Sequence, residues 1–210
     1  MEREGEWPIY EALDHPLPNE RMRWLMLAIQ REMGSYGLPL LLRQAGLDRY
    51  VGRLPPADRR LKAQVDEYAR LVQAMRTYYG LGARGAMLRI GREVFRRQLA
   101  ARPVEAFFER LRLRLLPLPR RRLRALQSLA ERMAWPEGDV SVQAIDSEVW
   151  LIDRSAHRTL GQKSDGPSCW IAVGEIAEAL LWATGVEHLV EEKACRAAGD
   201  DCCRFLIQQP

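Results

Sequence analysis

The sequence predicts an α+β fold, in which a helical N-terminal half is followed by a mostly antiparallel sheet with packed helices. As far as about residue 135, apolar residues recur at helical spacing, as in Met22, Leu25, Met26, Ile29 and Met33. After Pro136-Glu137-Gly138 the pattern changes to short alternating or strand-like apolar runs. We therefore expect a mainly helical region over residues 1–135 and a sheet-bearing region over 136–210, joined in one continuous structural unit.

Six helices are expected in the first region, most of them bounded by glycine or proline. They cover residues 21–33, 37–47, 61–79, 86–100, 103–116 and 120–135. Residues 1–20 contain three prolines and no clean period, so an irregular arm is expected there.

The second region is expected to be a β-hairpin, a helix and a second β-hairpin. Val140, Val142 and Ala144 alternate with polar residues, and residues 149–152 form a strand-like apolar run. Residues 170–184 read as an apolar helix closed by Gly185. The segments 186–197 and 202–207 then flank a turn at Ala198-Gly199-Asp200-Asp201.

Composition places the chain among ordinary globular proteins. Of 210 residues, 47% are apolar and 29% are charged, which can supply a real core. No membrane span is expected, because the most apolar stretch, residues 170–186, carries Glu175 and Glu178. The N-terminus lacks a secretory signal, so a cytoplasmic location is expected, where four cysteines serve as ligands or free thiols rather than disulfides.

Two motifs suggest other chemistry, and both favour a structural interpretation. Gly80-Leu81-Gly82-Ala83-Arg84-Gly85 fits a dinucleotide fingerprint, but a helix rather than a strand precedes it, which favours a helix–helix turn. Residues 109–134, which include the arginine-rich stretch 110–124, contain no aromatic residue for base stacking. A solvated basic face is therefore favoured over nucleic-acid binding. No redox cofactor motif was found, which makes a binding protein more plausible than an enzyme.

The four cysteines gather in the last 42 residues, as Cys169, Cys195, Cys202 and Cys203. A turn symmetric about Gly199 would pair Cys195 with Cys203 and aim both thiols at one point, while Cys202 faces the other side. Cys169 begins the helix 170–184, and Glu192 lies three residues before Cys195. Three thiolates and a carboxylate form a set of four ligands suited to zinc, provided that a bulge brings Glu192 and Cys195 to one side. Buried thiols or a redox disulfide are the alternatives.

The segment Cys169-x4-Gly174, Gly185-Val186 and Glu192-x2-Cys195-x3-Gly199-x3-Cys203-Arg204-Phe205 resembles the 4-vinyl-reductase, or hydrocarbon-binding, domain family. The resemblance covers mainly residues 137–208. It implies a fold related to subunits of vesicle-tethering complexes and a structural zinc ion on Cys169, Glu192, Cys195 and Cys203, with iron as an open alternative. It also implies a homodimer.

The same resemblance implies a pocket for a hydrophobic, aromatic or tetrapyrrole ligand. Apolar and aromatic residues near the cysteines are candidates to line it, although burial in the core is the commoner fate of such residues: Trp150, Ile152, Trp170, Ile176, Trp182 and His188. The function expected on this basis is a zinc-stabilised sensor, carrier or chaperone. The alternative is an enzyme or accessory factor of (bacterio)chlorophyll biosynthesis.

Overall fold

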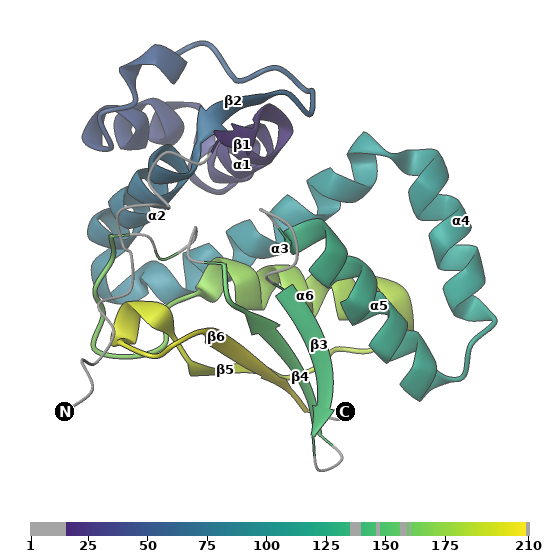
Figure 1. Ribbon diagram of the computed structural model, residues 1–210. Helices are drawn as coiled ribbons and strands as arrows, with labels where there is room; N and C mark the ends of the chain where they lie inside the picture. Colours follow the sequence, from purple (N-terminus) through teal and green to yellow (C-terminus); the bar gives the residue numbers. More distant parts are fainter. Residues whose placement is uncertain (1–15, 135–139, 146–147, 156–158, 160, 209–210) are drawn as a thin grey trace.

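The computed structural model describes residues 16–134, 140–145, 148–155, 159 and 161–208, and it has the expected α+β architecture (Figure 1). A four-stranded antiparallel sheet forms one layer, and helices from both halves of the chain lie on one of its faces. A second group of helices, with a two-stranded sheet, packs beyond them. The predicted relation to vesicle-tethering subunits and the division at residue 135 stay predictions.

The N-terminal group is built on two long helices. Its elements are β1 (Pro16–Pro18), α1 (Asn19–Gln44), the 3-10 turn η1 (Asp48–Tyr50), β2 (Leu61–Gln64) and α2 (Val65–Tyr79). The two helices expected over 21–33 and 37–47 meet without a loop in α1 and are separated by a kink at Gly34, whose non-helical φ of +77° is accessible to glycine.

Two expectations for this group were wrong in the same place. Residues 61–64 are a strand rather than the start of a helix, and they pair with residues 16–18, which had been assigned to the arm. The helix begins only at Val65 because Gln64 forms a capping box with Glu67, whose carboxylate accepts the backbone N–H of Gln64 at 3.1 Å. Pairing of two segments more than 40 residues apart leaves no local signal in the sequence.

The remaining helices connect the two halves. They are α3 (Ala83–Ala101), α4 (Pro103–Arg114), α5 (Leu118–Met133) and α6 (Trp170–Thr184). The α3 and α6 backbones touch: a Cβ atom at Gly91 would lie 2.1 Å from the Ile171 carbonyl oxygen, and one at Gly174 would lie 2.2 Å from the Leu88 carbonyl oxygen. Glycine at both positions is therefore what allows this crossing.

The sheet has the strand order β3-β4-β6-β5, and all its neighbours are antiparallel. Its strands are β3 (Val140–Ile145), β4 (Glu148–Asp153), β5 (Val190–Ala194) and β6 (Cys203–Ile207). All four lie in the predicted segments, but β5 is shorter than the expected 186–197, and the 3-10 turn η3 (Arg196–Ala198) follows it. One face packs on α5 and α6, where Leu151 and Phe205 are fully buried. The described helices include none with the length and apolar character that crossing a membrane requires.

Replacing Gly174 with alanine should destabilise the fold, because the new methyl group meets backbone atoms of α3 that cannot move independently. We expect a loss of about 1–3 kcal/mol or more in the free energy of unfolding, measured by urea denaturation. Gly82→Ala is the matched control, since a Cβ atom there meets nothing within 4 Å. Equal stability of the two variants would contradict the close crossing.

Candidate metal centre

Three elements bring the four predicted ligand residues together. Cys169 is the N-cap residue of α6, Glu192 lies in β5, Cys195 directly follows that strand, and Cys203 begins β6. One ligand atom from each residue lies within 4.8 Å of all the others. The three cysteines are buried and Glu192 is half-buried. The sequence-predicted cluster is thus present as a geometric unit.

The β5–β6 hairpin explains how Glu192 and Cys195 reach one side. The pairing of β5 with β6 is irregular between Glu192 and Ala194, which is the bulge that the sequence required. Beyond it, Ala194 pairs with Arg204, so the hairpin is symmetric about Gly199, whose φ is +102°. The Asp200 carboxylate accepts the backbone N–H of Cys195 at 2.7 Å and fixes the turn.

The distances between the sulfurs match those of thiolates sharing one metal ion. Cys169 Sγ lies 3.8 Å from Cys195 Sγ and 3.5 Å from Cys203 Sγ, and all three cysteines are free. Two thiolates bound at about 2.3 Å in a tetrahedral site would stand about 3.8 Å apart. The separations are far longer than a disulfide bond of about 2.05 Å.

Glu192 has one oxygen available to complete the set. Its Oε2 accepts the backbone N–H of Cys169 at 2.7 Å, whereas the buried Oε1 has no hydrogen-bond partner among the described residues. A buried carboxylate oxygen without a partner is costly, and a metal ion would satisfy it. The donor set therefore fits a metal ion that accepts three thiolates and one carboxylate.

Contacts among the three thiols shift their pKa values in opposite directions. Hydrogen bonds from Cys169 and Cys203 lower the pKa of Cys195, and the same contacts hold the pKa of Cys169 well above its usual value. For Cys203, the hydrogen bond with Cys169 lowers the pKa, whereas the hydrogen bond with Cys195 and burial raise it by more. The pKa of Cys203 therefore lies above its usual value. Burial raises the pKa of Glu192 to about 7.

Arg76, on α2, brings a positive charge to the cluster. Its Nη2 donates to the Ser168 carbonyl at 2.6 Å, and its guanidinium lies 5.8 Å from the Trp170 ring centroid. Burial lowers the pKa of Arg76, while Cys169, Cys195, Glu192 and Cys203 oppose that shift. Sequence reasoning missed this residue, because one arginine near the end of a helix is indistinguishable from its neighbours by spacing.

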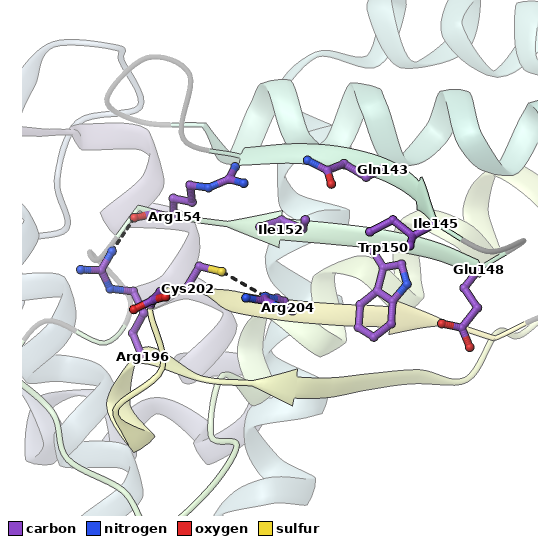
Figure 2. A pocket seen from close by; sticks show the side chains of 10 residues that line it. Gln143, Ile145, Glu148, Trp150, Ile152, Arg154, Arg196, Cys202 and Arg204 are labelled. Atoms are coloured by element: carbon purple, nitrogen blue, oxygen red, sulfur yellow. Dashed lines mark hydrogen bonds between the residues drawn. The ribbon is translucent and has the colours of Figure 1, made fainter.

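Cys202 faces away from the cluster, as the hairpin geometry predicted. Figure 2 shows it on the outer face of the sheet, where its sulfur accepts a hydrogen bond from Arg204 Nε at 3.4 Å. Trp150 and Ile152 lie on the same face and line an open cavity of about 860 Å³. They are therefore on the opposite side of the sheet from the four clustered ligands.

The six predicted pocket residues do not line one cavity. Trp150 and Ile152 are on the outer face, Ile176 is fully buried in the core, and Trp182 packs edge-on against Phe95 at 6.1 Å between ring centroids. Trp170 and His188 share a different space, a groove of about 560 Å³ between α3, α6 and β5. Glu192 also lines this groove.

The glycine motif has the structural role expected of it, whereas the solvated basic face expected of the arginine stretch stays a prediction. Residues 80–85 form the turn between α2 and α3, through the 3-10 turn η2 (Gly80–Gly82). The arginines of 110–124 are distributed over α4 and α5.

Comparisons with known proteins identify the fold through solved structures alone. No family model matches the sequence, and no curated protein matches it. An H-NOX protein from S. oneidensis in the Fe(II)NO ligation state aligns with a TM-score of 0.60 and 13% identity, over 91% of this chain and 98% of that chain. A mutant H-NOX protein from S. oneidensis in the Fe(II) state gives the same score and identity, over 91% and 95%. At 13% identity, these structural alignments show that the chain shares the fold of these proteins.

These comparisons overturn the resemblance to the 4-vinyl-reductase family. The structures that align over nine-tenths of the chain are heme–nitric oxide/oxygen binding proteins, a different family. The zinc-stabilised carrier or chaperone, the structural zinc cofactor and the role in (bacterio)chlorophyll biosynthesis are therefore wrong expectations. They rested on a ligand spacing that a helix N-terminus and a bulged hairpin produce by geometry, and such a spacing does not define a family.

The described residues do not form a heme site. The spaces between the α1–α2 group and the α3–α6 crossing hold only about 10 and 20 Å³, against roughly 300–1,000 Å³ for ordinary ligand pockets. Of the open grooves on the outer face of the sheet, between α4 and α5, and beside β5, only the last contains a histidine, and charged residues such as Arg84, Arg92 and Glu191 line that groove beside it. We therefore derive no chemistry through heme.

Removing the Arg76 charge should weaken the attachment of α2 to the candidate metal centre. Arg76→Gln loses a charged hydrogen bond to the Ser168 carbonyl, and we expect a cost of about 1.5–3 kcal/mol in urea unfolding. Arg59→Gln is the control, because its 3.8 Å ion pair with Glu20 leaves the arginine largely in water. A cost for Arg76→Gln no larger than the control's would show that the contact contributes little.

Proposed function

We propose that this chain is a sensor domain in which Cys169, Glu192, Cys195 and Cys203 bind one soft transition-metal ion. The observation that carries the proposal is the convergence of four ligand atoms within 4.8 Å in a largely buried site. Thiolates favour soft metals such as those of the later first row, and the metal's identity is left to elemental analysis. The unsatisfied Oε1 of Glu192 supports the same conclusion.

A binding role is favoured over catalysis by the closed character of the site. Four protein ligands fill a tetrahedral ion, whereas catalytic metal sites keep one position for water or substrate. The fold shared with H-NOX proteins, whose solved structures are described by their ligation states, supports a sensor of small molecules as the class. Glu192 is the one ligand at the edge of an open groove, so it is the position at which a bound molecule would influence the metal.

The groove selects a ligand that donates a hydrogen bond. His188 Nδ1 lies 2.9 Å from the Val186 carbonyl, which can only accept, so the hydrogen is on Nδ1 and Nε2 is an acceptor. Burial lowers the pKa of His188 and keeps the ring neutral. Nε2 has no partner within the described part of the chain, while Trp170 and Val173 supply an apolar wall. A small apolar molecule with an N–H or O–H group meets both requirements.

Metal content tests the first part of this proposal. We expect about one metal ion per chain by elemental analysis, with Cys169→Ser, Cys195→Ser and Cys203→Ser each losing it. Added Co²⁺ should give thiolate-to-metal absorption with the wild type and not with these variants. Cys202→Ser is the matched control, because it is adjacent and buried but faces the other side. Absence of metal, or equal loss in Cys202→Ser, would overturn the proposal.

A matched pair of probes tests the groove. Indole has an N–H donor, and 1-methylindole has nearly the same apolar body without it. We expect indole to shift NMR signals of β5 and of the N-terminal end of α6, and 1-methylindole to bind several-fold more weakly, since a lost hydrogen bond is worth about 0.5–1.5 kcal/mol. His188→Phe should remove the difference. Equal binding of both probes to the wild type would contradict the assigned role of His188.

A further inference from the structure

Helix α4 carries an apolar stripe that the rest of the described chain does not cover. Its exposed fractions lie between 49% and 81%, and the residues are Val104, Phe107, Phe108, Leu111 and Leu115. The only buried residue of α4 itself is Leu113, which faces the body of the protein. In Figure 1, α4 stands at the edge of the molecule, away from the sheet and from the α1–α2 group.

The stripe is a continuous surface rather than scattered apolar residues. At 100° per residue its five members fall within an arc of about 100°, which is the width of a helix face that packs against a partner. Leu113 lies about 180° from Val104, so the stripe points directly away from the core. A contiguous apolar face of this kind on an otherwise charged helix marks an interaction site.

We infer that the α4 stripe pairs with the same stripe of a second copy of this chain, with the two helices antiparallel about a two-fold axis. Such isologous pairing is the commonest way for a self-complementary patch to be buried. The homodimer was expected from a family resemblance that the comparisons overturn. The α4 surface is an independent reason to expect a dimer.

Charge complementarity supports a second copy and fixes the orientation. Glu105 and Arg112 lie about 20° apart around the helix, on the same flank of the stripe, and seven residues apart along it. In an antiparallel two-fold pair, like flanks meet with reversed direction, so Glu105 of one copy faces Arg112 of the other, twice. In a parallel two-fold pair, opposite flanks of the stripe meet instead, so Glu105 and Arg112 would not face each other.

Both charges are available for this contact. The Glu105 side chain is 73% exposed, and its contact with Arg102 is long, at 4.0 Å. Arg112 makes no ion pair with any residue that the structure describes. A groove of about 590 Å³ between α4 and α5 borders the same flank, and Val104, Phe108 and Leu116 line it beside these charges. The partner's stripe thus meets both an apolar recess and two opposite charges.

Self-association as a function of concentration tests the interface. By sedimentation velocity, the full chain should pass from monomer to dimer as concentration rises, and Leu111→Glu should remain monomeric. Leu81→Glu, at an exposed apolar residue outside α4, is the matched control and should dimerise like the wild type. A wild type that stays monomeric throughout would overturn the inference, as would a Leu111→Glu variant that still dimerises. The first result would leave the stripe for a different protein.

A charge exchange and a cross-link test the orientation. Glu105→Arg and Arg112→Glu should each raise the dimer dissociation constant several-fold, and the double variant should restore it, because the exchanged charges still face each other. Under mild oxidation, a mixture of Val104→Cys and Leu115→Cys should form a disulfide-linked dimer, whereas neither variant should link to itself. The native cysteines are all buried. Self-linking of Val104→Cys would indicate parallel pairing and contradict the proposed geometry.

Discussion

The backbone contact between α3 and α6 is the constraint on which the rest of the architecture depends. Because Gly91 and Gly174 have no side chains, the two helices cross without a layer of side chains between them. Glu178, which is almost fully buried on α6, accepts hydrogen bonds from Arg92 and Arg96 and holds the crossing in one register. The crossing fixes where α6 begins, and it leaves too little space at this level for a large prosthetic group.

The start of α6 in turn determines the candidate metal centre. Cys169 precedes the helix by one residue, so the α3–α6 crossing places its sulfur against the β5–β6 hairpin. The hairpin contributes the other three ligands only because β5 is bulged after Glu192. Arg76 then connects the centre to α2, so three parts of the fold meet at four ligand atoms. The H-NOX structures share the fold of this chain.

The sequence predicted most of the elements and the clustering of Cys169, Glu192, Cys195 and Cys203 well, because both depend on short-range periodicity and turn chemistry. The symmetry about Gly199 and the need for a bulge could be worked out from spacing alone. The pairing of β1 with β2 and the role of Arg76 could not, because each joins distant segments through an ordinary residue. The predicted pocket residues lie apart for a related reason. Trp150 on the outer face and Ile176 in the core are both apolar residues in apolar segments, and the sequence does not distinguish their positions. The family resemblance was misleading because it was read from the metal-ligand pattern and covered only the last third of the chain.

The groove beside the candidate metal centre and the α4 stripe lie toward opposite ends of helix α3. Helix α3 passes the groove beside β5 at its N-terminal end and reaches α4 at its C-terminal end, about 28 Å away for 19 residues. A helix that connects two sites does not by itself make a sensor. Coupling is a free energy by which binding at one site changes the affinity at the other, and it acts in both directions. If binding of a metal ion or of a groove ligand strengthens dimerisation through α4, then dimerisation must raise the affinity for that ion or ligand by the same factor. The α3–α6 crossing transmits such coupling only if the two ends shift together, and because the same crossing positions Cys169, loosening it would weaken the candidate metal centre together with the coupling.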